Sequence, residues 1–236
     1  MGLTTVADTD RAKLFDRGSL LIAGALSAAA AKPHLLIGLC GGRSVSGLLQ
    51  ALMKQTTTMA PLWPKLHFFL VDERMVPNDH PDSNFYLLNQ ELFLKLMEAG
   101  TIVAGQVHPY SFEGQDRGTG KYAEEFFKLG TAFDLAILSA GEDGHVASLF
   151  PHHPGNQKAE PGFLIVEGSP KPPPTRMSAS RTLLSRSLCN VLMFLGQEKL
   201  EAYKRFQDPQ LTVEDCPAKL AQSATDSIVL TDLNVR

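Results

Sequence analysis

The sequence predicts an α/β fold in which helices cover both faces of a mainly parallel β-sheet. Segments with helical periodicity alternate along the chain with short apolar runs, and those runs are apolar at nearly every position instead of every second one. Such continuous runs are typical of parallel strands that are buried on both faces. The chain has 236 residues, of which 44% are hydrophobic. This length supports one core, and we expect residues 1–236 to form a single domain.

The first half of the chain contains two predicted strands, at residues 34–40 and 66–72. Asp8 or Thr9 is expected to cap a helix that runs to about residue 31. Apolar residues at helical spacing predict further helices after each strand, and the second of these is expected to be capped by Ser83. The polar segments 55–64 and 73–83 are predicted to be loops.

The second half continues the alternation. A helix is predicted around Tyr122, Phe126 and Leu129, and another over residues 197–206, where Glu201 and Arg205 are expected to pair at i, i+4. The remaining predicted strands are 133–139, 162–167, 189–195 and 226–232. In open α/β sheets ligands bind at the carboxyl ends of the strands, so the loops after residues 40, 71, 139 and 167 are candidates for the site.

Composition excludes several classes of partner. The net charge is −3, and the 22 basic and 25 acidic residues are mixed along the chain, which argues against nucleic-acid binding and against an anionic membrane as partner. The alanine-rich stretch LLIAGALSAAAA is short for a membrane span and is interpreted as a core helix. Three distant cysteines and no secretory signal indicate a reducing, cytoplasmic location. The sequence does not define an oligomeric state, and a monomer is compatible with it.

The stretch GLCGGRSVSGLL joins the first predicted strand to a helix. Gly41 and Gly42 expose backbone N–H groups at the start of that helix, which favours binding of an anion such as phosphate, and Arg43 adds a positive charge. The stretch is not a nucleotide P-loop, because Leu48 and Leu49 stand where Lys and Ser or Thr are needed. The alternative interpretation is a tight strand-to-helix turn without ligand.

Charged residues also follow the second predicted strand, in FLVDERMVPNDHPDSN. The fork of the Arg74 guanidinium is suited to a phosphate group, and Asp72 is suited to a sugar hydroxyl or to proton transfer. The alternative is an ion pair between an Asp and an Arg that ties two loops together.

The strand at 133–139 leads into GEDGHVASLFP, in which a helix is expected to begin near the histidine. Asp143 and His145 lie two residues apart on a glycine turn, where the carboxylate can orient the imidazole for proton transfer. The N–H of Gly144 is a further candidate contact for an anion. The alternative is an Asp that caps the helix beside a surface His.

Lys171 and Arg176 flank three prolines, which predicts a stiff loop that presents two cations or, alternatively, an ordinary surface loop. No metal site is predicted, since the adjacent His152 and His153 lack the spacing of a helical site. Cys40 is interpreted as a small buried residue. These features together suggest acid–base chemistry on a small phosphorylated molecule without a cofactor.

Three motifs resemble the 6-phosphogluconolactonases in order and spacing: GLCGGRSVSGLL, VDERMVPNDHPDSN and GEDGHVASLFP, with SPKPPPTR in support. The resemblance covers nearly the whole chain. Related aminosugar-phosphate deaminases continue differently after Gly-His, so ASLFP and SPKPPP favour the lactonase branch. The resemblance implies a Rossmann-like sheet of the sugar-phosphate isomerase type. It also implies hydrolysis of 6-phospho-D-glucono-1,5-lactone to 6-phospho-D-gluconate, step 2 of the oxidative pentose phosphate pathway, without metal or nucleotide.

The resemblance also implies roles for individual residues. His145 would be the general base that activates water, and Asp143 would support it. Asp72 would face the sugar. The 6-phosphate would be bound by a set of cationic and backbone groups: Arg74, Lys171, Arg176, Gly41, Gly42 and Arg43. Arg43 departs from the family's usual small hydroxyl residue, and residues 177–187 are less apolar than the family's strand.

Two alternatives remain open from the sequence. One is an aminosugar-phosphate isomerase or deaminase on the same scaffold, in which Asp72 would remove a proton from a sugar C–H. The other is a non-catalytic sugar-phosphate sensor, which would keep the cations but would not need His145.

Overall fold

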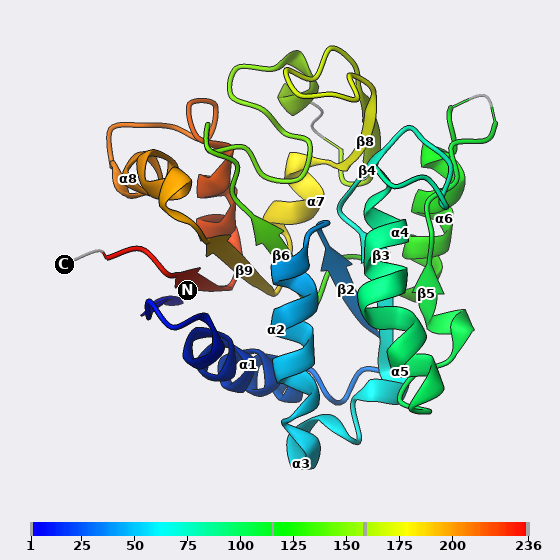
Figure 1. The fold of residues 1–236 in the computed structure, drawn as a ribbon. Coiled ribbons are helices and arrows are strands. Elements are labelled where there is room, and N and C mark those ends of the chain that lie inside the picture. Colours follow the sequence, from blue (N-terminus) through cyan, green and yellow to red (C-terminus); the bar gives the residue numbers. More distant parts are fainter. Residues whose placement is uncertain (1, 115, 158–159, 235–236) are drawn as a thin grey trace.

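The computed structural model describes residues 2–114, 116–157 and 160–234 and contains two β-sheets (Figure 1). The main sheet has seven strands in the order β1-β10-β9-β6-β2-β3-β5, and every neighbouring pair is parallel. This sheet confirms the predicted α/β class. Its strands are β1 (Gly2–Ala7), β2 (Leu35–Leu39), β3 (Leu66–Leu70), β5 (Val107–His108), β6 (Leu135–Ser139), β9 (Cys189–Phe194) and β10 (Asp226–Thr231).

Helices cover both faces of the main sheet, as the residues of β3 show. Phe68 packs against Phe93, in a π-helical turn (Asn89–Phe93) between α4 (Asn84–Leu88) and α5 (Leu94–Glu98). The next residue, Phe69, points to the opposite face and packs against Phe126 of α6 (Thr119–Leu129). Successive side chains of a strand alternate between faces, so an apolar residue at both positions requires cover on both sides.

The helices α1 (Arg11–Ala28) and α2 (Arg43–Met53) pack against each other beside the main sheet. Gly18 allows α1 to lie close to the sheet, because a Cβ atom there would lie 2.9 Å from the side chain of Leu230 in β10. The remaining α-helices are α3 (Thr56–Met59), α7 (Arg181–Ser185) and α8 (Leu200–Gln207). No helix among the residues that the structure describes is long and apolar enough to cross a membrane.

A second, antiparallel sheet was not expected from the sequence. It contains β4 (Asp72–Arg74), β8 (Arg176–Ala179) and β7 (Phe163–Val166), with β8 in the centre. The strand predicted at 162–167 therefore exists as β7 but does not join the parallel sheet. Three of its four residues are buried, Phe163 against Tyr122 and Phe126 of α6, and a continuous apolar run does not reveal which sheet a strand joins.

Several predicted boundaries were wrong. Asp10, and not Asp8 or Thr9, caps α1 by accepting hydrogen bonds from the backbone N–H groups of Ala12 and Lys13. The strand β1 was missed because its residues are mostly exposed at the sheet edge, where an apolar run is not required. The short α3 lies within the predicted loop 55–64. The cap at Ser83 is confirmed, since its hydroxyl accepts from the N–H of Tyr86.

Candidate active site

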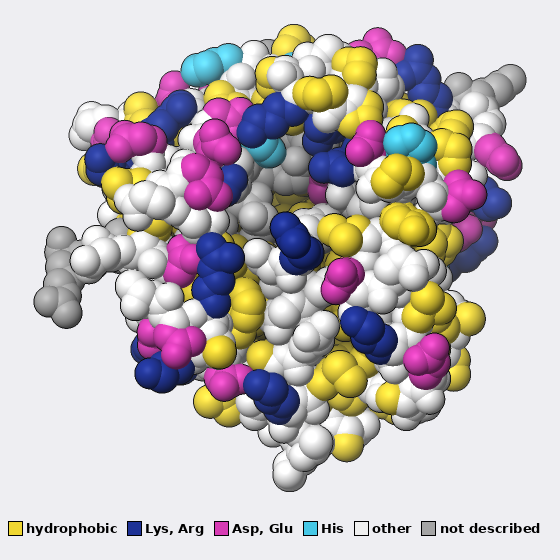
Figure 2. All heavy atoms as spheres, in the orientation of Figure 1, with side chains coloured by type: hydrophobic (Ala, Val, Ile, Leu, Met, Phe, Trp, Pro, Cys, Tyr) yellow, Lys and Arg dark blue, Asp and Glu magenta, His cyan; other side chains and the backbone are white. Residues whose placement is uncertain are grey.

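A cleft of about 310 Å³ opens where the central strands β2, β6 and β9 end and the small sheet begins. Figure 2 shows this hollow on the upper part of the molecule, with Lys and Arg side chains and a histidine around it. Its position agrees with the rule that ligands bind at the carboxyl ends of parallel strands. The lining residues are Cys40, Gly41, Asp72, Arg74, Asn84, Ser139, Ala140, Gly141, His145, Ala147, Lys171, Pro172, Arg176 and Lys199.

The turn at residues 141–145 holds His145 at the floor of this cleft. The backbone N–H of Gly141 donates to the carbonyl of His145 at 2.8 Å, and that of Gly144 donates to the carbonyl of Gly141 at 3.0 Å. A side chain at Gly141 is excluded, because a Cβ atom there would lie 2.0 Å from the imidazole Nδ1. Residues 146–149 form a second tight turn, so the helix expected to begin near His145 is not present.

Asp143 fixes the imidazole through a short hydrogen bond, at 2.5 Å between its Oδ1 and His145 Nδ1. The same oxygen accepts from the backbone N–H of His145 at 3.2 Å. Burial by itself would raise the pKa of Asp143, but the hydrogen bond and the charge of His145 outweigh it and hold the pKa at about 2. Because a carboxylate only accepts hydrogen bonds, Nδ1 carries the proton and the neutral ring has its lone pair at Nε2.

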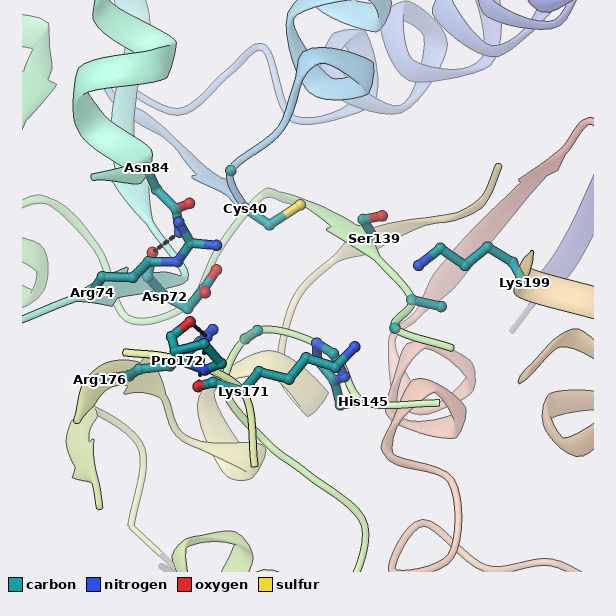
Figure 3. Close-up of a pocket in the computed structure, with 14 residues that line it drawn as sticks. Cys40, Asp72, Arg74, Asn84, Ser139, His145, Lys171, Pro172, Arg176 and Lys199 are labelled. Atoms are coloured by element: carbon teal, nitrogen blue, oxygen red, sulfur yellow. Dashed lines mark hydrogen bonds between the residues drawn. The ribbon is translucent and has the colours of Figure 1, made fainter. Parts of the chain in front are cut away.

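The imidazole is also confined by packing. Its ring lies 4.6 Å from the ring of Phe150, centroid to centroid, and its side chain is 14% exposed. Figure 3 shows His145 facing the same cavity as Asp72, Arg74 and Lys171. The arrangement places the imidazole in a cleft with several cations, where the Nε2 of its neutral form is suited to removing a proton from water.

The strand β4 contributes the opposite wall of the cleft, and Glu73 anchors it. Glu73 is 1% exposed, and its carboxylate accepts from the backbone N–H groups of Arg74, Asn84 and Phe85 and from the hydroxyl of Ser83. The pKa of Glu73 lies above its ordinary value, because the effect of burial exceeds the opposite effect of the four donors. This carboxylate joins β4 to the start of α4, and thereby fixes the backbone on either side of Asp72 and Arg74.

Asp72 and Arg74 do not pair with each other. The hydroxyl of Ser148 donates to Asp72 at 3.4 Å, and Arg74 Nη1 donates to the carbonyl of Asp82 at 2.6 Å. Arg74 Nε is buried without a hydrogen-bond partner. Among the residues that the structure describes, neither side chain forms an ion pair, so the ion-pair alternative considered from the sequence is not observed.

In the turn after β2, glycine is needed at two positions for two different structural reasons. Gly42 has a φ of +118°, a conformation that side chains disfavour. At Gly41 the reason is space, since a Cβ atom would lie 1.9 Å from Oδ1 of Asn84. The amide of Asn84 is oriented by its Nδ2, which donates to the carbonyl of Asp72 at 2.9 Å. Arg43 is exposed and, like Gly42, does not line the cleft.

Arg176 organises the proline loop beside the cleft. It is 4% exposed, and its Nε and Nη2 donate to the carbonyls of Lys171, Pro172 and Pro173 at 3.0–3.1 Å. Its guanidinium also lies 5.8 Å above the Phe150 ring. Most of its donors are therefore used within the protein, whereas the ammonium group of Lys171 has no such partner among the described residues and lines the cleft.

The structure brings most of the predicted site residues together. Six of them line the cleft: Gly41, Asp72, Arg74, His145, Lys171 and Arg176. Asp143 and Gly144 are not among the lining residues, and the N–H of Gly144, predicted as a contact for an anion, donates to the carbonyl of Gly141 within the turn. Cys40 is buried, which raises the pKa of its thiol. Among the described residues, no group of three or more metal-ligating side chains is placed to hold a metal ion.

Sequence reasoning did not assign Lys199 and Asn84 to the site, although both line the cleft. Lys199 follows β9 and reaches the cleft from the side opposite Arg74 (Figure 3). The same strand-end rule, applied to the loop after residue 195, would have pointed to it. Asn84 is recognisable only from the fold, because nothing in its local sequence shows that it packs against Gly41.

Residues 9–230 match the family model for glucosamine-6-phosphate isomerases/6-phosphogluconolactonase. The chain belongs to this family. A 6-phosphogluconolactonase from Borreliella burgdorferi is 36% identical over 199 residues, which is 84% of this chain and 83% of that protein. One from Thermotoga maritima is 35% identical over 170 residues, or 72% of this chain and 73% of that protein.

The fold of the chain also matches the folds of solved structures. The crystal structure of the Thermotoga maritima 6-phosphogluconolactonase superimposes with a TM-score of 0.79 at 26% identity and covers 97% of this chain and 99% of that one. A monomeric glucosamine-6-phosphate deaminase has a TM-score of 0.76 at 19% identity, with 98% of this chain and 97% of that one covered. The second likeness concerns the fold alone.

We predict that Glu73→Gln destabilises the protein by about 2–3 kcal/mol, because the glutamine NH₂ would face buried donors that the carboxylate now satisfies. Urea unfolding at pH 7 measures the change. The exposed Glu98→Gln serves as the matched control and is expected to leave the midpoint unchanged. Equal stability of the two variants would show that Glu73 does not anchor β4.

Proposed function

We propose that this chain hydrolyses 6-phospho-D-glucono-1,5-lactone to 6-phospho-D-gluconate, the second step of the oxidative pentose phosphate pathway. The observation that carries the proposal is the single cleft that contains both His145, paired with Asp143, and the cations Arg74, Lys171 and Lys199. The 6-phosphogluconolactonases among its relatives, at 35–36% identity over most of the chain, support the same reaction.

In the proposed mechanism, Nε2 of His145 accepts a proton from a water molecule as that water attacks the lactone carbonyl carbon. The resulting tetrahedral intermediate collapses by breaking the bond from that carbon to the ring oxygen. The protonated imidazole returns its proton to the departing ring oxygen, which becomes a hydroxyl group. Asp143 remains ionised throughout, because its pKa is about 2, and it stabilises the imidazolium that forms.

The phosphate group anchors the substrate in this proposal. A phosphate dianion binds to cations that line the cleft, namely Arg74 and Lys171 with Lys199 on the facing side. Asp72, which is buried at the cleft wall, accepts a hydrogen bond from a sugar hydroxyl. Arg176 acts mainly on the loop that carries Lys171, since its donors are already bound to that loop's carbonyls. A lactone is reactive toward water, so positioning and one base suffice without a cofactor.

The cellular setting follows from the same chemistry. The substrate is a small phosphorylated metabolite, and the three cysteines are free and buried, which fits a reducing compartment such as the cytoplasm.

His145→Ala is expected to lower kcat on the lactone by about 10²–10⁴-fold while KM changes little, because the base is lost and the phosphate contacts remain. A pH-stat assay with freshly prepared lactone, corrected for spontaneous hydrolysis, measures both constants. His34→Ala, at the amino end of β2, is the matched control and keeps full activity. Full turnover by His145→Ala would refute the base assignment. Ammonia release from glucosamine 6-phosphate by the unmodified protein would instead favour the deaminase alternative.

Lys171→Ala and Arg74→Ala are expected to raise KM by about 10–100-fold with a smaller effect on kcat. Each substitution removes a cation that binds the phosphate and leaves the groups around the reacting carbon unchanged. The same assay over a range of lactone concentrations measures this. Lys95→Ala, on the distant α5, is the control. If both cleft variants lowered kcat and left KM unchanged, the phosphate would have to bind elsewhere.

A further inference from the structure

Arg205 on α8 lies on the far side of the turn that carries His145, away from the cleft. The ion pair expected between Glu201 and Arg205 is not formed, because Lys204 takes that place, with 2.6 Å between its Nζ and Glu201 Oε1. Arg205 instead reaches across to two backbone carbonyls. Its Nη1 donates to the carbonyl of Asp143 at 3.2 Å, and its Nη2 donates to the carbonyl of Asp215.

The first of these contacts acts on the peptide group between Asp143 and Gly144. The carbonyl of that peptide accepts from Arg205, and its N–H donates to the carbonyl of Gly141 at 3.0 Å. The peptide plane is therefore held at both ends. Gly144 follows at a φ of +85°, so the chain reverses there before it reaches His145. Among the described residues, Arg205 is the one charged side chain that donates to the backbone of the 141–145 turn.

The second contact ties the turn to a supporting segment, residues 212–218. In this segment the N–H of Ala218 donates to the carbonyl of Gly144 at 2.8 Å. The two segments pack so closely that a Cβ atom on Gly144 would lie 2.7 Å from Sγ of Cys216. Arg205 bridges the turn and the supporting segment, and α8 packs against β9, which belongs to the main sheet (Figure 1).

We propose that Arg205 is a positioning residue for the reaction: its guanidinium fork fixes the Asp143–Gly144 peptide and thereby holds the carboxylate of Asp143 against the imidazole of His145. This inference rests on the proposed function, in which His145 is the base. Arg205 acts from behind the turn and is not among the cleft-lining residues, so it has no contact with substrate.

The geometry explains why both bonds of the fork matter. A guanidinium presents its donors in a fixed plane and can hold two carbonyls at once, whereas an ammonium group is a point charge on a flexible stem. The imidazole position depends on a 2.5 Å hydrogen bond from a residue two positions away in the same turn, so a shift of the peptide moves both partners. Small displacements of catalytic groups lower the rate of the chemical step, while binding through the cations of the cleft is retained.

The test compares kcat and KM for lactone hydrolysis in Arg205→Ala, Arg205→Lys and Lys204→Ala. We expect kcat to fall about 10–50-fold in Arg205→Ala and about 3–10-fold in Arg205→Lys, because lysine retains the charge and one of the two bonds. KM is expected to stay within about twofold in both variants, since the cations that bind phosphate are untouched. Lys204→Ala changes the neighbouring exposed residue and is expected to leave both constants unchanged.

Thermal unfolding and circular dichroism of each variant separate positioning from loss of folded protein. If Arg205→Ala does not fold, the folded Arg205→Lys variant decides the matter by the same split between kcat and KM. Unchanged kcat in folded Arg205 variants, together with a large loss in His145→Ala, would overturn the role of Arg205 and leave the proposed function intact. Full activity of His145→Ala would overturn the assignment of His145 as the base, on which this inference rests, whereas only a lack of lactone hydrolysis by the unmodified protein would overturn the proposed function itself. A rise in KM without a fall in kcat would also contradict a positioning role.

Discussion

The hydrogen bond between Asp143 and His145 is the contact on which the proposed chemistry of the site depends, because it orients the imidazole. In the neutral ring it favours the proton at Nδ1 and the lone pair at Nε2, because a carboxylate only accepts hydrogen bonds. The turn that makes this contact is fixed by its own backbone hydrogen bonds and by donors from behind, and Gly141 leaves the space that the ring occupies. Orientation by a carboxylate gives an otherwise ordinary imidazole a defined tautomer and a defined position.

The two sheets determine what faces this imidazole. Three parallel strands of the main sheet end at one side of the cleft, and the short antiparallel sheet supplies the wall that carries Asp72 and Arg74. Glu73 fixes that wall by a buried carboxylate with four donors. The cations thus come from segments far apart in sequence, and the cleft exists only once both sheets are formed. A mobile phosphorylated substrate would meet a rigid, positively charged surface with one base in it.

Much of the fold and of the position of the site was predictable from the amino-acid sequence. The central strands are apolar at nearly every position, and the glycine turns after them mark the strand ends, so the site's edge of the sheet and His145 followed from the sequence. The small sheet did not, because β8 reads RMSA and has no apolar signature, although tertiary packing buries it fully. Gly41 was assigned to anion binding, whereas the structure gives it a spatial reason that involves Asn84, more than 40 residues away. Arg205 was assigned to a helical ion pair because sequence spacing cannot register a contact across the fold.

The central claim is that one cleft holds the reacting carbon beside His145 while the phosphate is bound by cations of the same cleft. A crystal structure with 6-phospho-D-gluconate bound tests it most directly. The account predicts that a carboxylate oxygen of the product lies within hydrogen-bond distance of His145 Nε2, and that the phosphate contacts Arg74 and Lys171. Binding of the product with its carboxylate remote from His145, or with its phosphate outside the cleft, would contradict the account.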